Sequence, residues 1–125
     1  MSHFTHIKTC FRNLVYLERA LTKLNISYKV AQTQNLGKKT IIIPQSNGHS
    51  IKFVWNEHEY EFTVDRHFWQ QSSTVESFNA KVLQQYASEV ILSESQKIGF
   101  QPIKYQQNFD GSSTLVLERW KHSVN

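Results

Sequence analysis

The chain has 125 residues, of which 39% are hydrophobic and 13% aromatic, which is enough for a packed core and excludes a disordered chain. Its formal charge of +4 is a mild excess of basic over acidic residues. The basic residues are scattered along the chain, whereas most nucleic-acid binders cluster them. No apolar run approaches the ~18 to 20 residues that a membrane span needs, and one cysteine excludes an intrachain disulfide framework.

The first half of the chain predicts the order strand, helix, strand, strand. Residues 3–9 favour a short strand, and a leucine stripe predicts a helix over 11–24 that stops at Asn25. Apolar and polar residues alternate over 26–30, which is the period of a strand. Residues 34–37 form a turn, and 40–43 a short buried strand. The helical stripe consists of Phe11, Leu14, Leu17, Leu21 and Leu24.

The second half predicts a hairpin, a long helix and two closing strands. Residues 51–55 and 59–65 alternate around a turn at 56–58. A helix then begins after an N-cap within 72–74 and ends at Gly99. The closing strands are 100–107 and 114–120, joined by an Asp-Gly turn. The helix carries a core stripe with further apolar residues beside it: Phe78, Val82, Tyr86 and Val90, then Leu83, Ala87 and Ile91.

These elements predict an α+β fold in one domain over residues 1–125. We expect a two-layer sandwich with a mostly antiparallel sheet of about six or seven strands and both helices on one face. The other face of the sheet would then be open.

The hairpin gathers acidic residues. If its second strand runs straight to His67, alternation places Glu59, Glu61, Asp65 and His67 on one side. Carboxylates with an imidazole can bind a divalent metal or share acid–base work, so a metal-dependent enzyme that uses Glu61, Asp65 and His67 is one hypothesis. The opposite side of the strand is apolar, however, which favours acids that simply face water.

The remaining reactive residues follow no catalytic pattern. The six histidines lack the spacing that makes two imidazoles converge on a helix. Cys10 is placed at the start of the first predicted helix, where the helix dipole could lower a thiol pKa, but a packing role is favoured. No glycine loop suited to phosphate and no nucleophile elbow is found in the sequence. The sequence therefore predicts no catalytic residue, no cofactor and no metal ligand.

The tryptophans offer a binding surface. Trp55, Trp69 and Trp120 could stack nucleobases if they lay on an exposed sheet face beside lysines. Trp55 continues the apolar row of Ile51 and Phe53, which favours burial in a core or an interface. An open sheet face with aromatic residues also suits a protein partner, because aromatic side chains dominate interface energetics.

Several motifs together resemble a known family. They are Met1–Thr5 with Ile7–Thr9, the leucine-striped helix, Trp55, the segment 65–69, and Gln85-Tyr86-Ala87. The chain resembles the hypothetical chloroplast open reading frame thirty-five family of plastids and cyanobacteria, also catalogued as a bacterial domain of unknown function. It departs from its relatives at Gln70, where they often have glycine, and at the turn 56–58.

The resemblance implies a plastid-encoded protein of the stroma, for which no transit peptide is needed. It implies no known activity or cofactor. We expect a non-enzymatic accessory role in which the open sheet face binds a protein partner or a second copy; RNA binding is the alternative. The signature residues Trp55, Asp65, Trp69 and Tyr86 are the candidates for interaction, and the first three are expected to hold the hairpin against the long helix.

Overall fold

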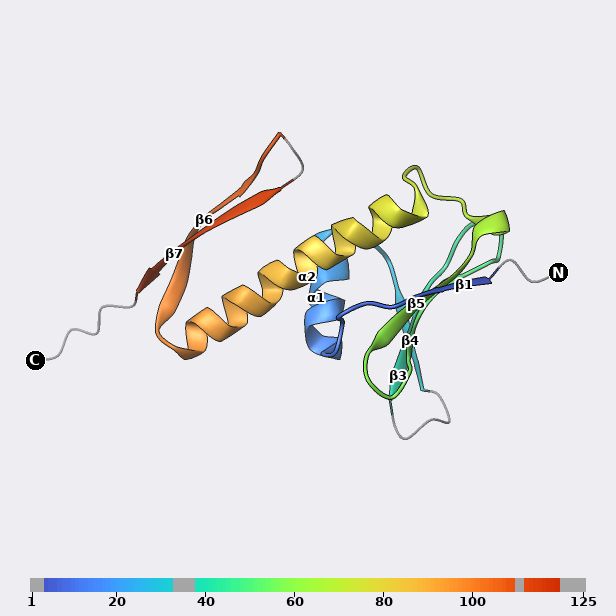
Figure 1. The fold of residues 1–125 in the computed structure, drawn as a ribbon, viewed down its shortest axis with the longest axis horizontal. Helices are drawn as coiled ribbons and strands as arrows, with labels where there is room; N and C mark the ends of the chain where they lie inside the picture. Colours follow the sequence, from blue (N-terminus) through green and yellow to red (C-terminus); the bar gives the residue numbers. More distant parts are fainter. Residues whose placement is uncertain (1–3, 33–37, 110–111, 120–125) are drawn as a thin grey trace, which may run out of the picture.

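The structure is a computed structural model that describes residues 4–32, 38–109 and 112–119. That part of the chain contains seven strands and two α-helices, with one 3₁₀ turn before the second helix. The elements are β1 (Phe4–Ile7), α1 (Leu14–Lys23), β2 (Lys29–Gln32), β3 (Lys39–Ile43), β4 (Ile51–Trp55), β5 (Tyr60–Asp65), the 3₁₀ turn Arg66–Phe68, α2 (Val75–Lys97), β6 (Phe100–Gln107) and β7 (Ser113–Arg119). Both helices lie on the same side of the sheet that β1 to β5 form (Figure 1).

The first five strands form one antiparallel sheet in the order β1-β5-β4-β3-β2. Because side chains alternate along a strand, Ile41, Phe53 and Phe62 meet in one row on the helix-facing side, and all three are fully buried. The rings of Phe53 and Phe62 stack with their centroids 5.1 Å apart. The helices complete this core with Leu17, Ala20, Leu21, Val75, Phe78, Val82 and Tyr86.

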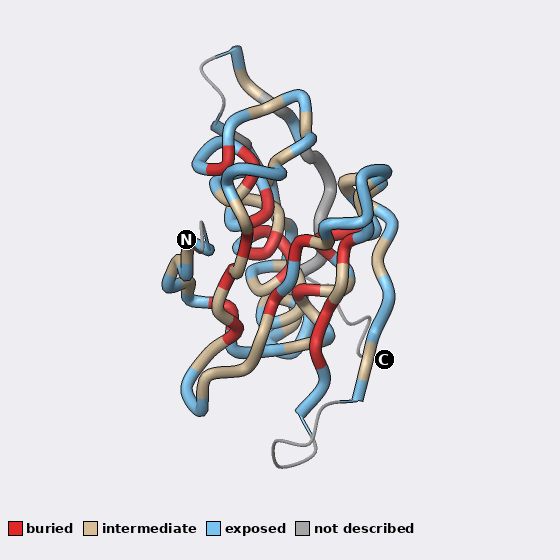
Figure 2. Tube along the Cα trace, turned by 90° about the vertical axis from the view of Figure 1, so that its right-hand side faces the viewer, coloured by how far each residue is buried: buried red, intermediate tan, exposed pale blue. Residues whose placement is uncertain are grey.

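The opposite face of the sheet is turned toward the viewer in Figure 2, and no helix lies in front of it. One row of residues on this face crosses all five strands: His6, Thr63, Lys52, Ile42 and Lys29. This outer face is therefore open, as the sequence predicts, and it is mixed in polarity.

Helix α1 begins and ends at residues that satisfy its free backbone groups. The Asn13 side-chain oxygen accepts hydrogen bonds from the N–H groups of Val15 and Tyr16, at 2.9 and 3.3 Å. Asn25 follows the helix with φ of 57°, the left-handed conformation that the sequence predicts for the stop at this residue.

The predicted start of α1 at residue 11 is wrong by three residues, because the helix begins at Leu14. Phe11 lies in the segment before the helix and is nevertheless fully buried. Its ring centroid lies 5.7 Å from that of Phe53 and 4.9 Å from that of Tyr86. Phe11 is therefore apolar because it is buried in the core, and it is not part of the helical stripe.

Helix α2 runs for 23 residues between the predicted boundaries. Thr74 caps its start by accepting a hydrogen bond from the Ser77 N–H at 3.1 Å, and Gly99 follows its end with φ of 93°. The residues of α2 that are buried all lie between Val75 and Glu89. The last two turns therefore extend past the core. No helix among the described residues is both long and apolar enough to cross a bilayer.

The fold class is confirmed: the protein is α+β with a mostly antiparallel sheet and two helices. The seven strands nevertheless divide into two sheets, since β6 and β7 form a separate two-stranded ribbon. A helix of this length covers about 34 Å at 1.5 Å per residue and leaves β6 far from the edges of the first sheet (Figure 1). The ribbon makes its main outside contacts with α2.

Several predicted strands differ in their bounds from those observed: 3–9 is observed as Phe4–Ile7, and 40–43, 59–65 and 114–120 begin one residue away from the prediction. The strand expected over 26–30 is observed as β2, Lys29–Gln32, because Ile26 still belongs to the helix end: its N–H donates to the Leu21 carbonyl at 2.9 Å. Ile26 and Tyr28 instead pack against the core from the connecting loop. The turn at 34–37 and the last residue of the predicted strand 114–120 lie outside the described residues.

Candidate functional site

The acidic strand does not form a site with His67. Strand β5 ends at Asp65, whose carboxylate accepts a hydrogen bond from the His67 N–H at 3.0 Å and starts the 3₁₀ turn. The 3₁₀ turn ends the alternation of the strand before His67. The predicted alignment of His67 on one side with Glu61 and Asp65 is therefore wrong. Among the described residues, no group of three or more potential ligands is arranged to hold a metal ion. The structure therefore does not bring Glu61, Asp65 and His67 together.

Glu61 has local partners on the outer face of the sheet. One carboxylate oxygen lies 3.2 Å from His6 Nδ1 on the neighbouring strand β1, and the other accepts a hydrogen bond from the Asn56 side chain at 3.1 Å. These contacts connect the turn of the β4–β5 hairpin, through Glu61, to the edge strand β1. A structural role accounts for the residue.

The other candidate side chains are dispersed. His49 stacks on Phe68 with ring centroids 3.6 Å apart and an angle of 2° between the planes. Cys10 is exposed and lies three residues ahead of the N-cap Asn13, so its predicted place at the helix start is wrong. The chain at Cys10 has no regular secondary structure, and α1 begins only at Leu14. His3, His122 and Trp120 lie outside the described residues.

Trp69 connects the hairpin to α2. Its indole N–H donates to the Ser73 carbonyl at 2.7 Å, next to the α2 N-cap. Its ring meets Phe62 of β5 and Phe78 of α2 edge-on, with centroids 6.4 and 5.3 Å away. The side chain thus packs at the inner side of the sheet.

An ion pair lies close to Trp69. The Arg66 guanidinium donates to the Glu76 carboxylate at 2.5 Å, which joins the 3₁₀ turn to the first turn of α2. This hydrogen bond is the main cause that lowers the pKa of Glu76 below its usual value. Both side chains are largely exposed, so the pair adds little stability.

Trp55 also lies toward the helices rather than on the open face. Its ring meets Tyr60 edge-on at 5.0 Å between centroids, and the Lys38 ammonium lies 4.7 Å from its ring centroid. Neither Trp55 nor Trp69 is therefore available as a stacking platform on the outer face of the sheet.

Tyr86 fixes the start of α1 to the middle of α2. Its hydroxyl oxygen accepts hydrogen bonds from the backbone N–H groups of Arg12 and Asn13, at 3.1 and 3.0 Å. Its ring packs on Phe11 in the core. A single side chain thus orients the chain that leads into the first helix.

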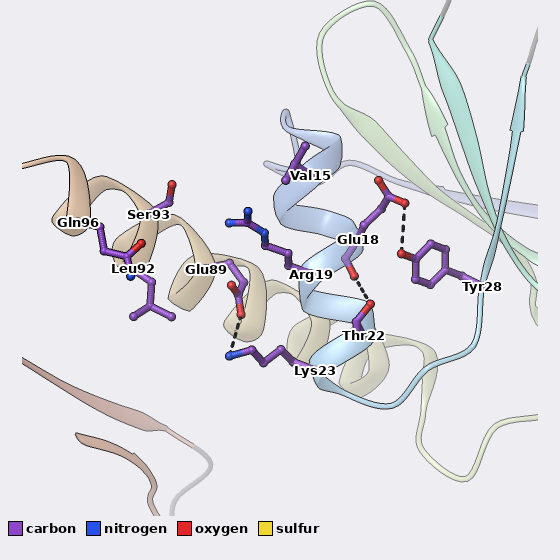
Figure 3. Close-up of a pocket in the computed structure, with 10 residues that line it drawn as sticks. All are labelled: Val15, Glu18, Arg19, Thr22, Lys23, Tyr28, Glu89, Leu92, Ser93 and Gln96. Carbon is purple, nitrogen blue, oxygen red and sulfur yellow. Dashed lines mark hydrogen bonds and ion pairs between the residues drawn. The ribbon is translucent and has the colours of Figure 1, made fainter. Parts of the chain in front are cut away.

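A groove of about 560 Å³ lies between α1 and the second half of α2 (Figure 3). Glu89 is 4% exposed there, although it is charged. Its Oε1 accepts a hydrogen bond from the Gln85 amide at 3.2 Å and lies 3.7 Å from the Lys23 ammonium of α1. The groove is lined by Val15, Glu18, Arg19, Thr22, Lys23, Tyr28, Glu89, Leu92, Ser93 and Gln96.

Sequence reasoning missed Glu89. It lies seven residues after Val82 and three after Tyr86, so it occupies the core-facing side of α2. An acid on an otherwise apolar stripe was the available signal. Removing a partner from a buried charge is destabilising, so the ion pair with Lys23 is best understood as a contact that holds the two helices together.

The chain matches the family described as "Protein of unknown function (DUF1257)" over residues 20–116. The chain belongs to this family. It is 51% identical over 124 residues to "Uncharacterized protein ycf35" of Trieres chinensis, a match that covers 94% of the chain and 97% of that protein. Proteins of the same name from Guillardia theta and Pyropia yezoensis are 39% and 34% identical, over 97% and 98% of the chain and 99% and 100% of their own lengths.

These matches confirm the resemblance to the hypothetical chloroplast open reading frame thirty-five family, since the relatives carry that name. No solved structure matches the chain at comparable significance. In this member of the DUF1257 family, Trp55, Asp65 and Trp69 lie at or next to the ends of strands and turns, and Tyr86 lies in the middle of α2, where its hydroxyl contacts the segment before α1.

The family member carries a second apolar stripe on α2, away from the core. Leu83, Ala87 and Ile91 follow at intervals of four, and Ile98 follows at the end of the helix. All four are exposed, with Ile98 at 69%. The sequence places the first three beside the core stripe, but the sheet and α1 cover only the other side of α2.

Proposed function

We propose that the protein is a non-enzymatic accessory factor of the plastid stroma that binds another protein, and that α2 carries the binding surface. The observation that supports this proposal is the exposed apolar stripe of Leu83, Ala87, Ile91 and Ile98. When a helix carries apolar residues on two sides, both sides are typically covered by other parts of a protein. Exposed apolar patches of this kind mark interaction sites.

The position of the stripe supports the same role. The second half of α2 and the β6–β7 ribbon extend away from the five-stranded sheet (Figure 1). This part of the molecule, residues 90–109 and 112–119, is called the arm; it carries Ile91 and Ile98, and Leu83 and Ala87 lie on the two turns of α2 before it. A two-stranded ribbon is at best marginally stable alone, so a protein that packs against the arm would stabilise both the ribbon and the end of α2.

The open sheet face supports protein binding less well than the arm. Its central row combines Lys52, Ile42 and Thr63, and its described aromatic residue is Phe4 at the edge. RNA binding through aromatic stacking on this face loses its main support, because Trp55 and Trp69 pack on the opposite side of the sheet.

The test is a double variant on the stripe, Leu83→Glu with Ile91→Glu. Tagged protein is used to capture partners from plastid extract, and light scattering measures the mass of the purified protein. We expect a captured protein or a dimer with the unaltered chain and its loss in the variant, because two carboxylates cannot be buried in an apolar interface.

The matched control is Val30→Glu on the edge strand β2, since Val30 is 40% exposed and Leu83 is 39% exposed. The control should retain binding. A strict monomer that captures nothing, or a captured protein that both variants retain equally, contradicts the proposal.

A further inference from the structure

A second hollow, of about 350 Å³, lies where the first turn of α1 approaches the starts of β3 and β5. Its lining is mostly polar and carries three cationic side chains. The residues are Arg12, Asn13, Leu14, Lys38, Lys39 and Tyr60. It is separate from the groove of Figure 3 and from the arm.

The buried Tyr60 points to a ligand in this hollow. The residue is only 2% exposed, and its own backbone N–H is fixed by the Phe11 carbonyl at 2.7 Å. Within the part of the chain that the structure describes, its hydroxyl group makes no hydrogen bond. Tyr60 is one of the residues that line the hollow, and its hydroxyl is not among the described side-chain atoms that are both sealed from solvent and without a partner.

The charges around the hollow favour an anion. Arg12 and Lys39 make no ion pair among the described residues, and Lys38 lies over the Trp55 ring. Glu18, the acidic residue of α1, accepts a hydrogen bond from the Tyr28 hydroxyl at 3.2 Å. Burial, followed by the negative charge of Glu18, raises the pKa of Tyr60, whose hydroxyl is a donor at neutral pH; Glu18 is thus the acid that opposes the three cations.

The N-terminus of α1 adds a backbone donor. Asn13 caps the N–H groups of Val15 and Tyr16, whereas that of Leu14 has no hydrogen bond among the described residues. A helix N-terminus presents partial positive charge and free N–H groups to an anion.

We propose that this hollow binds the phosphate group of a small phosphorylated compound. The three cations and the N-terminus of α1 suit a doubly charged group, and the Tyr60 hydroxyl supplies a neutral donor. Arginine and ammonium groups form their strongest hydrogen bonds to such oxygens.

The probes are inorganic phosphate and pyrophosphate, titrated into the full chain at low salt with binding followed by calorimetry. We expect saturable binding that weakens as salt is raised, since exposed charges are screened. Arg12→Gln should weaken binding about tenfold or more, and Tyr60→Phe about tenfold, because each removes one hydrogen bond to a charged group.

The matched control is Lys52→Gln, which removes a cation of the same charge on the outer face of the sheet and should leave the affinity unchanged. Thermal unfolding of Tyr60→Phe shows whether the variant keeps its fold. Absent saturation, or an affinity that Arg12→Gln and Lys52→Gln lower equally, overturns the proposal.

Discussion

At the residue scale, a few polar atoms connect segments that are distant in the sequence. The Tyr86 hydroxyl receives two backbone N–H groups from the segment before α1, more than 70 residues earlier. The Tyr16 hydroxyl, by contrast, donates a hydrogen bond to the Ser93 hydroxyl of α2 at 2.8 Å. Since both tyrosines project from helices, their hydrogen bonds fix how α1 and α2 lie against each other.

We expect Tyr86→Phe to lower the free energy of unfolding by about 1 to 3 kcal/mol, because two partly buried N–H groups lose their acceptor while the ring is retained. Urea unfolding measures the change. Tyr28→Phe is the control, since its hydroxyl bonds a side chain of α1 and should cost under about 1 kcal/mol. Equal losses in the two variants would show that the Tyr86 hydroxyl has no special part.

The candidate residues show how far sequence alone reaches at this scale. Alternation correctly separates the acids of β5 from its apolar face, because a strand has a fixed period of two. It does not reveal that Asp65 ends the strand, since the capping bond to the His67 N–H depends on the local turn. Tyr60 lies on the apolar side of the strand, and the sequence does not show that it lines a hollow beside α1.

At the element scale, the 3₁₀ turn and Trp69 join the hairpin to α2. Asp65 starts the turn, the Arg66–Glu76 pair crosses from it to the helix, and the Trp69 ring fills the space between Phe62 and Phe78. Because exposed ion pairs contribute little, we expect the Trp69 ring to contribute more to the stability of this connection than the Arg66–Glu76 pair does.

Trp69→Ala should destabilise the protein by about 3 kcal/mol, because it removes a large ring between two buried phenylalanines and leaves a cavity. Thermal or urea unfolding measures the loss. Phe109→Ala, at a fully exposed position near the tip of the ribbon, should change stability by less than about 0.5 kcal/mol. A small effect at Trp69 would mean that the hairpin and the helix are held by other contacts.

At the scale of the whole molecule, the described chain has a core at one end and an arm at the other. Every buried core residue that the structure describes lies between Phe11 and Tyr86, whereas β6 and β7 contact chiefly each other and α2. We propose that the chain is nevertheless one domain, because α2 runs without interruption from the core into the arm.

The arm should be the least stable part of this domain. We expect backbone amides of β6 and β7 to exchange with deuterium about 100-fold faster than those of β4 and β5, since the ribbon has two strands whereas β4 and β5 lie inside a five-stranded sheet. Hydrogen-exchange mass spectrometry on the purified chain measures both. Equal protection would show that the ribbon is held as firmly as the main sheet, and a bound partner should reduce the difference.

The sequence by itself determined the element order, most boundaries and the fold class, because turns, caps and periodicities are local properties of the backbone and its nearest side chains. The strand 51–55 and the helix stops at Asn25 and Gly99 follow directly from such signals. The tertiary structure decided what no local pattern contains: that β6 and β7 leave the main sheet, that α2 keeps one apolar stripe uncovered, and that Arg12, Lys39 and Tyr60 share a hollow. Each of these depends on the length and direction of α2 or on the approach of α1 to the sheet, which only the packed molecule fixes.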